Sequence, residues 1–180
     1  MNIRVTSGLA KNKKLVVPEI ENIRVVQDIA KLALFSIIGD RVVESECLDL
    51  YCGSGNLGIE ALSRGASWCD FVDENGASRE AVGQNILECG FSEHAEFYLK
   101  DAVKYVVRTD KKYNLVFADP FYETVTHRFL IKNIKKILKP KGLVAFFHGK
   151  NLDMAKLIDG TDLKIVTERH FGASYLTILS

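Results

Sequence analysis

Apolar and amphipathic stretches alternate along most of this chain. Short apolar runs typical of strands are separated by stretches in which apolar residues recur every three or four positions, as in helices with one buried face. The predicted strands are residues 47–51, 68–73, 95–99, 113–118 and 142–148. The predicted helices are residues 56–64, 76–89, 101–108, 124–138 and 151–158. Since parallel strands need crossover connections, the alternation predicts a mainly parallel sheet with helices on both faces.

The two ends of the chain show different patterns. Residues 3–6 and 14–17 are strand-like runs on either side of a turn, which predicts a small hairpin. A helical stripe that ends at Gly39 follows it. The stripe consists of Val26, Ile29, Ala30, Ala33, Leu34 and Ile37. Residues 163–169 and 174–179 are two further strand-like runs, too close together for a helix between them, so we expect an antiparallel hairpin.

The composition fits a single domain. The 180 residues are 47% hydrophobic and 26% charged, which suffices for one compact domain with a sizeable core. We expect this domain to span residues 1–180, with an N-terminal extension at 1–40 and a core at 41–180. No apolar run approaches the ~20 residues of a membrane span, and the start lacks the pattern of a signal peptide. The expected location is cytoplasmic, and the expected state is a monomer.

Cysteine and histidine spacing gives no sign of a metal site. The cysteines are scattered, and no pair has the C-x-x-C spacing of a zinc or redox site. They are Cys47, Cys52, Cys69 and Cys89. We interpret them as reduced thiols in the core and expect no bound metal.

A glycine-rich loop follows the first predicted core strand. Gly53, Gly55 and Gly58 have the spacing G-x-G-x-x-G, which lets the chain turn tightly and brings a ligand against bare backbone at a helix N-terminus. Asp73 ends the next strand, where its carboxylate can accept both hydroxyls of a ribose. Because a nicotinamide dehydrogenase shows the same two features, this pair indicates a nucleoside cofactor and leaves its kind open.

Three further acids narrow the choice. Asp49 lies inside an apolar strand, where an unpaired carboxylate is costly, so it should have a partner, and a ligand amino group is a good candidate. Asp101 follows the third predicted core strand and can either accept the exocyclic amine of an adenine or cap the next helix. The third acid ends the fourth core strand and begins the tetrapeptide Asp119-Pro120-Phe121-Tyr122.

This tetrapeptide suits the methylation of an aromatic amine. The lone pair of such an amine is delocalised into its ring, and the nitrogen becomes nucleophilic when it is held closer to tetrahedral geometry. The Asp119 carboxylate and the Pro120 carbonyl can accept the two N–H groups, and Tyr122 can stack on the base. The chemistry predicts methyl transfer onto a nucleic-acid base and does not distinguish a guanine amine from an adenine amine.

The chain resembles a known family in several places. Residues 49–66 are similar to the loop D-L-[FY]-x-G-S-G-x-L-G-x-E-A-L-S-R-G-A of a group of S-adenosylmethionine-dependent methyltransferases. Within that group, the chain most resembles the bacterial enzymes that methylate the exocyclic amine of a guanine in 16S ribosomal RNA of the small subunit. Residues 8–18 are similar to the N-terminal stretch of those enzymes, and residues 171–172 to their terminal Y-G hairpin, so the resemblance covers nearly the whole chain.

The resemblance implies a Rossmann-like class I methyltransferase. This is an α/β fold with a seven-stranded, mostly parallel sheet, a C-terminal antiparallel hairpin and a short N-terminal extension of hairpin and helix. The implied cofactor is S-adenosyl-L-methionine, and the implied partner is ribosomal RNA within a small-subunit particle, with no membrane and no metal. The implied catalytic residues are Asp119, Pro120, Phe121 and Tyr122. The implied cofactor-binding residues are Asp49, Tyr51, Gly53, Gly55, Asp73, Asp101 and Asp119.

Two departures from the family pattern bear on substrate and activity. The family's R-P-T-x-D-x-x-x-E-A-L-F stretch is clearly kept here only at Arg24, Asp28 and residues 34–35, which affects the choice of RNA. The family's D-P-P-[FY] has Phe121 in place of the second proline. Three alternatives therefore stay open. They are an adenine-N6 nucleic-acid methyltransferase, a NAD-dependent oxidoreductase, and a non-catalytic RNA-binding or assembly protein with this fold.

The net charge of +1 hides a separation of charge along the chain. Residues 68–101 contain eight acids and two basic residues, whereas residues 102–150 contain eleven Lys or Arg and three acids. Such asymmetry suits a positive surface for phosphates, although solvated helix faces explain a single cluster equally well. We interpret the basic residues of the predicted helix 124–138 in that second way. The residues expected to contact RNA phosphates beside the pocket are Arg4, Lys11, Lys13, Lys14 and Arg24.

Overall fold

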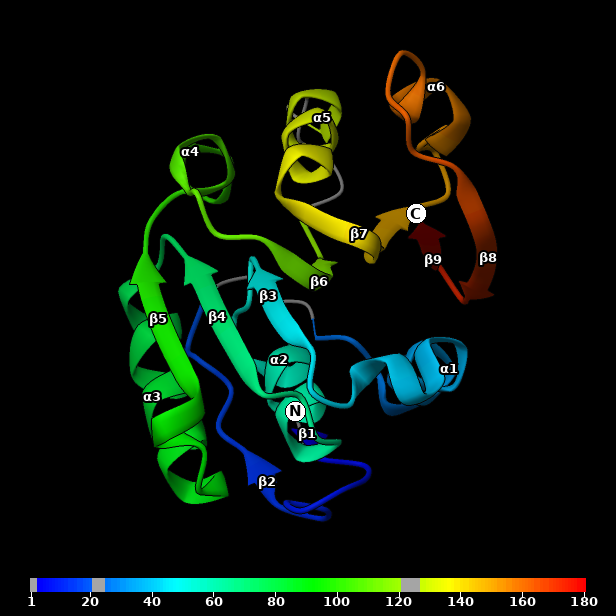
Figure 1. Ribbon diagram of the computed structural model, residues 1–180. Helices are drawn as coiled ribbons and strands as arrows, with labels where there is room; N and C mark the ends of the chain where they lie inside the picture. Colours follow the sequence, from blue (N-terminus) through cyan, green and yellow to red (C-terminus); the bar gives the residue numbers. More distant parts are fainter. Residues whose placement is uncertain (1–2, 21–24, 121–126) are drawn as a thin grey trace.

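A seven-stranded sheet forms the centre of the protein (Figure 1). The computed structural model describes residues 3–20, 25–120 and 127–180. In sheet order, the strands are β5 (Ala95–Leu99), β4 (Trp68–Asp73), β3 (Glu46–Leu50), β6 (Tyr113–Ala118), β7 (Leu138–Gly149), β9 (Ser174–Leu179) and β8 (Ile165–Phe171). β3 to β7 run parallel, and β9 pairs antiparallel with both β7 and β8. The predicted mainly parallel sheet with a C-terminal hairpin is confirmed.

Helices cover both faces of this sheet (Figure 1). They are α1 (Asp28–Ile38), α2 (Asn56–Ser63), α3 (Gly76–Cys89), α4 (Ala102–Arg108), α5 (His127–Ile137) and α6 (Met154–Ile158), with the short 3-10 helices η1 (Gly39–Val42) and η2 (Ser92–His94). Successive strand residues point to opposite faces. Phe71 and Phe117 therefore pack in one core cluster with α1, α2 and α3, and Val72 and Val116 in a second cluster with α4, α5 and α6.

The buried face of α1 differs from the predicted stripe. Its buried residues are Ala30, Lys31, Leu34, Phe35 and Ile38. Ile29, which we expected in the core, is 63% exposed, and Val26 precedes the helix. The prediction was wrong at these positions because Lys31, a charged residue, occupies part of the buried face, which no hydrophobic pattern reveals.

Several element boundaries also differ from the prediction. Helix α5 ends at Ile137 because Leu138 pairs with Tyr113 of β6, so β7 begins at Leu138 rather than at residue 142. Helix α6 begins three residues later than predicted, at Met154, because the Asp153 carboxylate caps it. β8 likewise begins at Ile165 rather than at residue 163. Residues 124–126 of the predicted α5 helix lie outside the described residues.

The predicted N-terminal hairpin is present, with shorter strands than expected. β1 (Ile3–Arg4) pairs antiparallel with β2 (Lys14–Leu15). The loop between them packs on the C-terminal end of α2, where the N–H of Leu9 donates to the carbonyl of Ser63 at 2.8 Å. A Cβ on Gly8, which has a φ of +84°, would lie 1.7 Å from that carbonyl oxygen. A glycine is therefore required where the hairpin docks on the core.

A buried ion pair ties this hairpin to α1 and α2. Lys31 is fully buried, and its Nζ lies 3.1 Å from a carboxylate oxygen of Glu60. The same Nζ donates to the carbonyl of Arg4 and to Oδ1 of Asn56, both at 2.6 Å. Glu60 also accepts the backbone N–H of Thr6 at 2.8 Å. Burial alone would raise the pKa of Glu60, but Lys31 and the bonds from Thr6 hold this pKa below its ordinary value.

Candidate active site

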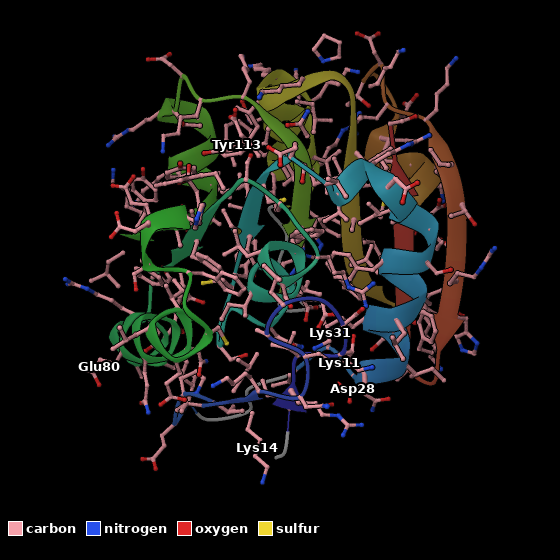
Figure 2. All side chains as sticks on the ribbon, turned by 60° about the horizontal axis from the view of Figure 1, so that its bottom comes forward. Lys11, Lys14, Asp28, Lys31, Glu80 and Tyr113 are labelled. Carbon is pink, nitrogen blue, oxygen red and sulfur yellow. The ribbon has the colours of Figure 1, made fainter. Side chains whose placement is uncertain are left out.

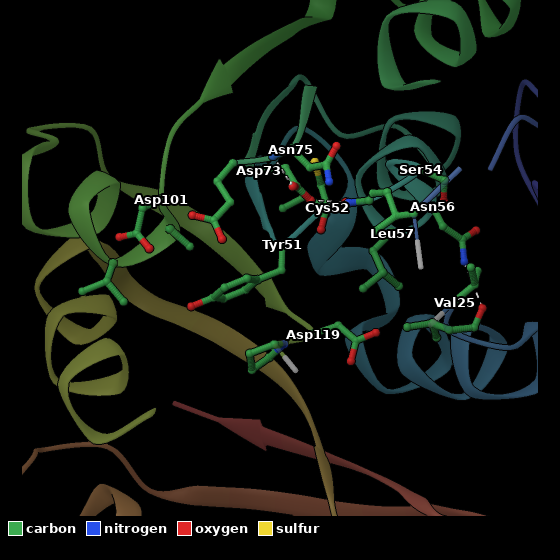
Figure 3. A pocket seen from close by; sticks show the side chains of 18 of the residues that line it. Val25, Tyr51, Cys52, Ser54, Asn56, Leu57, Asp73, Asn75, Asp101 and Asp119 are labelled. Carbon is green, nitrogen blue, oxygen red and sulfur yellow. Dashed lines mark hydrogen bonds between the residues drawn. The ribbon is translucent and has the colours of Figure 1, made fainter. Parts of the chain in front are cut away.

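A cavity of about 460 Å³ opens at the carboxyl ends of β3, β4 and β6 (Figure 3). Parallel strands end at the same edge of a sheet, so residues far apart in sequence meet there. The predicted site residues that line the cavity are Asp49, Tyr51, Gly53, Asp73, Asp101, Asp119 and Pro120. The remaining predicted catalytic residues, Phe121 and Tyr122, lie outside the described residues.

The glycine-rich loop turns its backbone toward the cavity. Tyr51, Gly53 and Gly55 have φ angles of 57°, 53° and 76°, and α2 begins directly after them, so its N-terminus faces the cavity. Gly53 lines the cavity, whereas Gly55 supplies the left-handed residue that starts the helix. A Cβ on Gly58 would lie 2.4 Å from a ring carbon of Phe71, so this glycine lets α2 pack closely on β4. The three glycines of the motif thus have three different physical roles.

Asp73, at the end of β4, holds this loop in place. One carboxylate oxygen accepts the N–H of Gly53 and the other that of Asn75, both at 2.9 Å. An ionised carboxylate has about four lone-pair sites, so both oxygens retain capacity for a ligand hydroxyl. Asp73 therefore fixes the loop, and its contact with ribose hydroxyls stays a prediction.

Asp49 is a buried carboxyl group at the floor of the cavity. It is 2% exposed, and Oδ2 accepts the N–H of Gly58 at 2.8 Å. The partner that we expected for this carboxylate therefore includes the backbone amide of Gly58. Burial raises the pKa of Asp49 well above its ordinary value, the Gly58 bond opposes this, and the nearby charges of Asp119 and Asp73 add to it. A cationic group of a ligand would relieve this unfavourable burial of charge.

Asp101 combines a structural role with a place at the cavity. Its Oδ1 accepts the N–H of Lys104 at 2.8 Å, so it caps α4, which was one of the two predicted roles. The residue also lines the cavity, and contact with an adenine amine stays a prediction. The side chain of Tyr51 borders the same cavity, and burial raises its pKa to about 12. The Tyr51 hydroxyl therefore stays protonated at neutral pH.

Asp119 brings a further carboxylate to the cavity from a different strand. It directly follows β6, whose Ala118 lies beside Leu50 of β3 in the sheet. Figure 3 shows the side chains of Asp73, Asp101 and Asp119 around one cavity. Asp119 and Pro120 therefore lie in the same cavity as the glycine-rich loop, although about seventy positions separate them in the sequence.

Comparison with known proteins assigns the chain to a family. Residues 3–180 match the family model described as "Conserved hypothetical protein 95". The chain belongs to this family. Its similarity to individual relatives extends over most of its length. It is 29% identical over 181 residues to YlbH of Bacillus subtilis (strain 168), covering 98% of this chain and 97% of that protein.

A second relative has a more specific name. The chain is 29% identical over 145 residues to ribosomal RNA small subunit methyltransferase D of Escherichia coli (strain K12), covering 79% of this chain and 70% of that protein. Among solved structures, the Escherichia coli protein yhhF superposes with a TM-score of 0.86 at 22% identity, covering 99% of this chain and 97% of that one. SMU.776, a structure complexed with SAH, superposes with a TM-score of 0.73 at 15% identity, covering 86% and 50%. The family member described here thus has the class I methyltransferase fold, as its sequence resemblance implied.

Sequence reasoning missed one wall of the cavity. Ile20, Val25 and Val26, all from the N-terminal extension, line it. The buried side chain of Asn56 holds this wall, because its Nδ2 donates to the carbonyl of Val26 at 3.0 Å while its Oδ1 accepts Nζ of Lys31. No local pattern marks an asparagine for this role, since its partners lie 25 and 30 positions away.

Four of the five predicted RNA-contact residues lie on the hairpin, away from the cavity. Arg4, Lys11, Lys13 and Lys14 are exposed, and none of them lines the cavity. Figure 2 shows Lys14 pointing outward from the hairpin. The hairpin loop docks at Ser63, at the opposite end of α2 from the cavity, and eight helical residues span ~12 Å. Arg24 lies outside the described residues.

The thiols and the remaining acids suggest no further chemistry at this site. Cys47, Cys52, Cys69 and Cys89 are all free thiols, and burial raises the pKa of Cys47 to about 12. Over residues 3–20, 25–120 and 127–180, no group of three or more His, Cys, Asp or Glu is placed to hold a metal ion. In the same ranges, no helix is both long and apolar enough to cross a bilayer.

Proposed function

We propose that this protein is an S-adenosylmethionine-dependent methyltransferase that modifies the exocyclic amine, N2, of a guanine in small-subunit ribosomal RNA. The observation that carries the proposal is the position of Asp119 and Pro120 at the end of β6, in the same cavity as Asp49, Gly53 and Asp73. The name of the Escherichia coli relative supports ribosomal RNA of the small subunit as the substrate.

The cavity fits the proposed cofactor. Its volume of about 460 Å³ is within the ~300–1,000 Å³ range of small-molecule sites. Asp73 lies where ribose hydroxyls can reach its carboxylate, and Asp101 where an adenine amine can. Asp49 provides a buried carboxylate for the amino group of the methionine part, beside the backbone of Gly53. When bound, S-adenosylmethionine supplies an electrophilic methyl group on a sulfonium sulfur.

The chain's own residues act on the nitrogen that is methylated. The Asp119 carboxylate accepts one N–H of the amine and the Pro120 carbonyl accepts the other, which turns the nitrogen lone pair toward the methyl donor. The same two acceptors stabilise the positive charge that develops on nitrogen during transfer. Once the new N–C bond has formed, the surplus proton leaves the nitrogen through Asp119 to water. Orientation supplies most of the rate enhancement, for which intramolecular models give about 7–11 kcal/mol.

The experiment that tests this function identifies the product. Purified protein is incubated with labelled S-adenosylmethionine and unmethylated ribosomal RNA, both free and within small subunits, and the labelled nucleosides are identified by mass spectrometry. We expect N2-methylguanosine. Labelled N6-methyladenosine would instead favour the adenine alternative, and absence of label in a protein that binds S-adenosylhomocysteine would contradict the proposal.

The buried carboxyl of Asp49 should make cofactor binding depend on pH. Its pKa is raised by burial in the ligand-free protein, whereas a bound ammonium group favours the carboxylate and lowers this pKa. Binding of S-adenosylhomocysteine should therefore release a proton below the raised pKa and become tighter as the pH rises through it. Calorimetry in buffers of different ionisation enthalpy measures the proton release, and Asp49→Asn should remove it. A proton uptake on binding would contradict this role.

Two substitutions at Asp101 separate its cap from its ligand contact. Asparagine caps helices about as well as aspartate, whereas alanine costs ~1 kcal/mol. We expect Asp101→Asn to leave the melting temperature nearly unchanged and to weaken S-adenosylhomocysteine binding by roughly tenfold, because its carboxylate is lost. Asp101→Ala should weaken binding and lower stability as well. If Asp101→Asn binds S-adenosylhomocysteine with unchanged affinity, the residue only caps the helix and does not contact the ligand.

A further inference from the structure

A second groove, of about 460 Å³, lies between the edge strand β5 and helix α4. It is rich in basic and aromatic side chains. Its lining residues are Tyr98, Lys100, Asp101, Lys104, Tyr105, Arg108, Thr109 and Lys111. Asp101 and Lys104 also line the active-site cavity, so the groove leads directly away from that cavity.

Helix geometry explains how the groove acquires its charge. Asp101, Lys104 and Arg108 follow one another at steps of three and four residues, which puts them on one face of α4. At a rise of 1.5 Å per residue, Lys104 and Arg108 are spaced ~6 Å apart along the helix axis. β5 is the edge strand of the sheet, so no further strand of the sheet covers the groove beyond it. The result is a row of cations along an open channel.

The four basic residues of the groove are not equivalent. The charge of Lys111 is paired with other residues of the protein, because its Nζ lies 2.9 Å from Asp70 and 3.5 Å from Glu96 and donates to the hydroxyl of Tyr98 at 2.8 Å. Lys100, Lys104 and Arg108, in contrast, form no ion pair with any residue that the structure describes. Lys111 therefore positions the Tyr98 side of the groove. Asp101 is the single carboxylate among the residues that line the groove with the other three cations.

We propose that this groove binds backbone phosphates of the substrate RNA next to the nucleotide that enters the active site. The inference rests on the proposed function, since it assigns a second contact for the same substrate. A row of cations on an open channel suits a ligand with a repeating negative charge. Its shared border with the cavity also favours RNA, because a base held at Asp119 keeps its neighbouring phosphates near the cavity rim. The hairpin loop, in contrast, docks on the opposite end of α2 from the cavity.

The test uses charge reversal in the full-length protein. Lys100→Glu combined with Arg108→Glu changes two groove residues that do not line the active-site cavity. Lys132→Glu combined with Lys136→Glu, on the exposed side of α5, is the control with the same change in net charge. Affinity for unmethylated ribosomal RNA is measured by filter binding at several salt concentrations, and affinity for S-adenosylhomocysteine is measured in parallel.

The groove variant should bind RNA at least tenfold more weakly than the control variant at low salt. The slope of log Kd against log salt should fall by about 1.5, as for two lost phosphate contacts. Affinity for S-adenosylhomocysteine should stay within twofold of the wild type, which shows that the variant is folded. Equal RNA affinity in the two variants would overturn the inference. It would also be overturned if the groove bound inorganic phosphate at millimolar concentration and bound RNA no more tightly than that.

These outcomes separate the inference from the proposed function. RNA binding that depends on Lys100 and Arg108, without any methylated product, would support the groove and contradict the activity. If the groove variant methylates ribosomal RNA as well as the wild type does, the result would support the activity and contradict the role of the groove. A wild-type protein that binds no ribosomal RNA would contradict both.

Discussion

Replacing Asp119 by alanine is expected to lower the rate of methyl transfer at least 100-fold, while S-adenosylhomocysteine affinity stays within about threefold of the wild type. In the proposed mechanism the carboxylate accepts an N–H of the reacting amine and stabilises charge that develops on nitrogen, and removing one such group typically costs ~10²–10³ in rate. The measurement is single-turnover transfer to ribosomal RNA at saturating cofactor, together with a titration of S-adenosylhomocysteine.

Asp119→Asn is the matched comparison. It keeps one acceptor oxygen at the same place and loses the negative charge, so its rate should lie between those of the wild type and Asp119→Ala. Under single-turnover conditions, slow product release cannot cause a difference in the measured rate between the variants. If Asp119→Ala transfers methyl groups at the wild-type rate, Asp119 has no part in the mechanism.

Lys31→Met should lower the free energy of unfolding by about 3–5 kcal/mol. The substitution leaves Glu60 buried without its cation, and breaking one side of a buried ion pair costs about that much. Urea denaturation measures the effect. The direction in which this free energy of unfolding changes with pH follows from the pKa of Glu60. Its pKa is lowered in the folded protein, so its contribution is present above the unfolded carboxyl value of about 4.3 and is lost as the pH falls below it.

A double-mutant cycle tests whether the two side chains are coupled. Glu60→Gln keeps an acceptor for the N–H of Thr6 but removes the charge. Lys31→Met with Glu60→Gln should therefore be less destabilised than the sum of the single variants, by 1 kcal/mol or more. Additive effects would show that Lys31 acts through packing of its aliphatic chain alone.

The sheet and the carboxylates of the site could be predicted from the sequence for simple reasons. Strands and helices have different periods, and their strict alternation leaves few topologies. Asp73, Asp101 and Asp119 lie at or just after the ends of predicted strands, and parallel strands end at one edge, so their meeting in one cavity followed from the topology. The prediction that the buried carboxylate of Asp49 needs a partner was also correct, because it accepts the backbone N–H of Gly58. Contact with a ligand amino group stays a prediction.

What the sequence could not show depends on contacts between distant residues. The burial of Lys31 follows from Glu60 and Asn56, which lie in another helix. The end of α5 is set by pairing of Leu138 with Tyr113, a tertiary contact that competes with helix propensity. The distance of Lys11 from the cavity follows from the docking of its loop on α2. Each of these requires the assembled fold, because no local period encodes it.

The N-terminal extension, whose hairpin docks on α2, contributes residues to both the core and the cavity. Val5 and Leu15 are in the main core cluster, and Val25 and Val26 line the cavity. A ligand that contacts Val25 and Val26 would therefore bind more weakly to a protein whose hairpin was detached, and its binding would stabilise the attached hairpin by the same free energy. A fragment that begins at residue 41 would thus keep the acids that line the cavity and lose the wall formed by Ile20, Val25 and Val26.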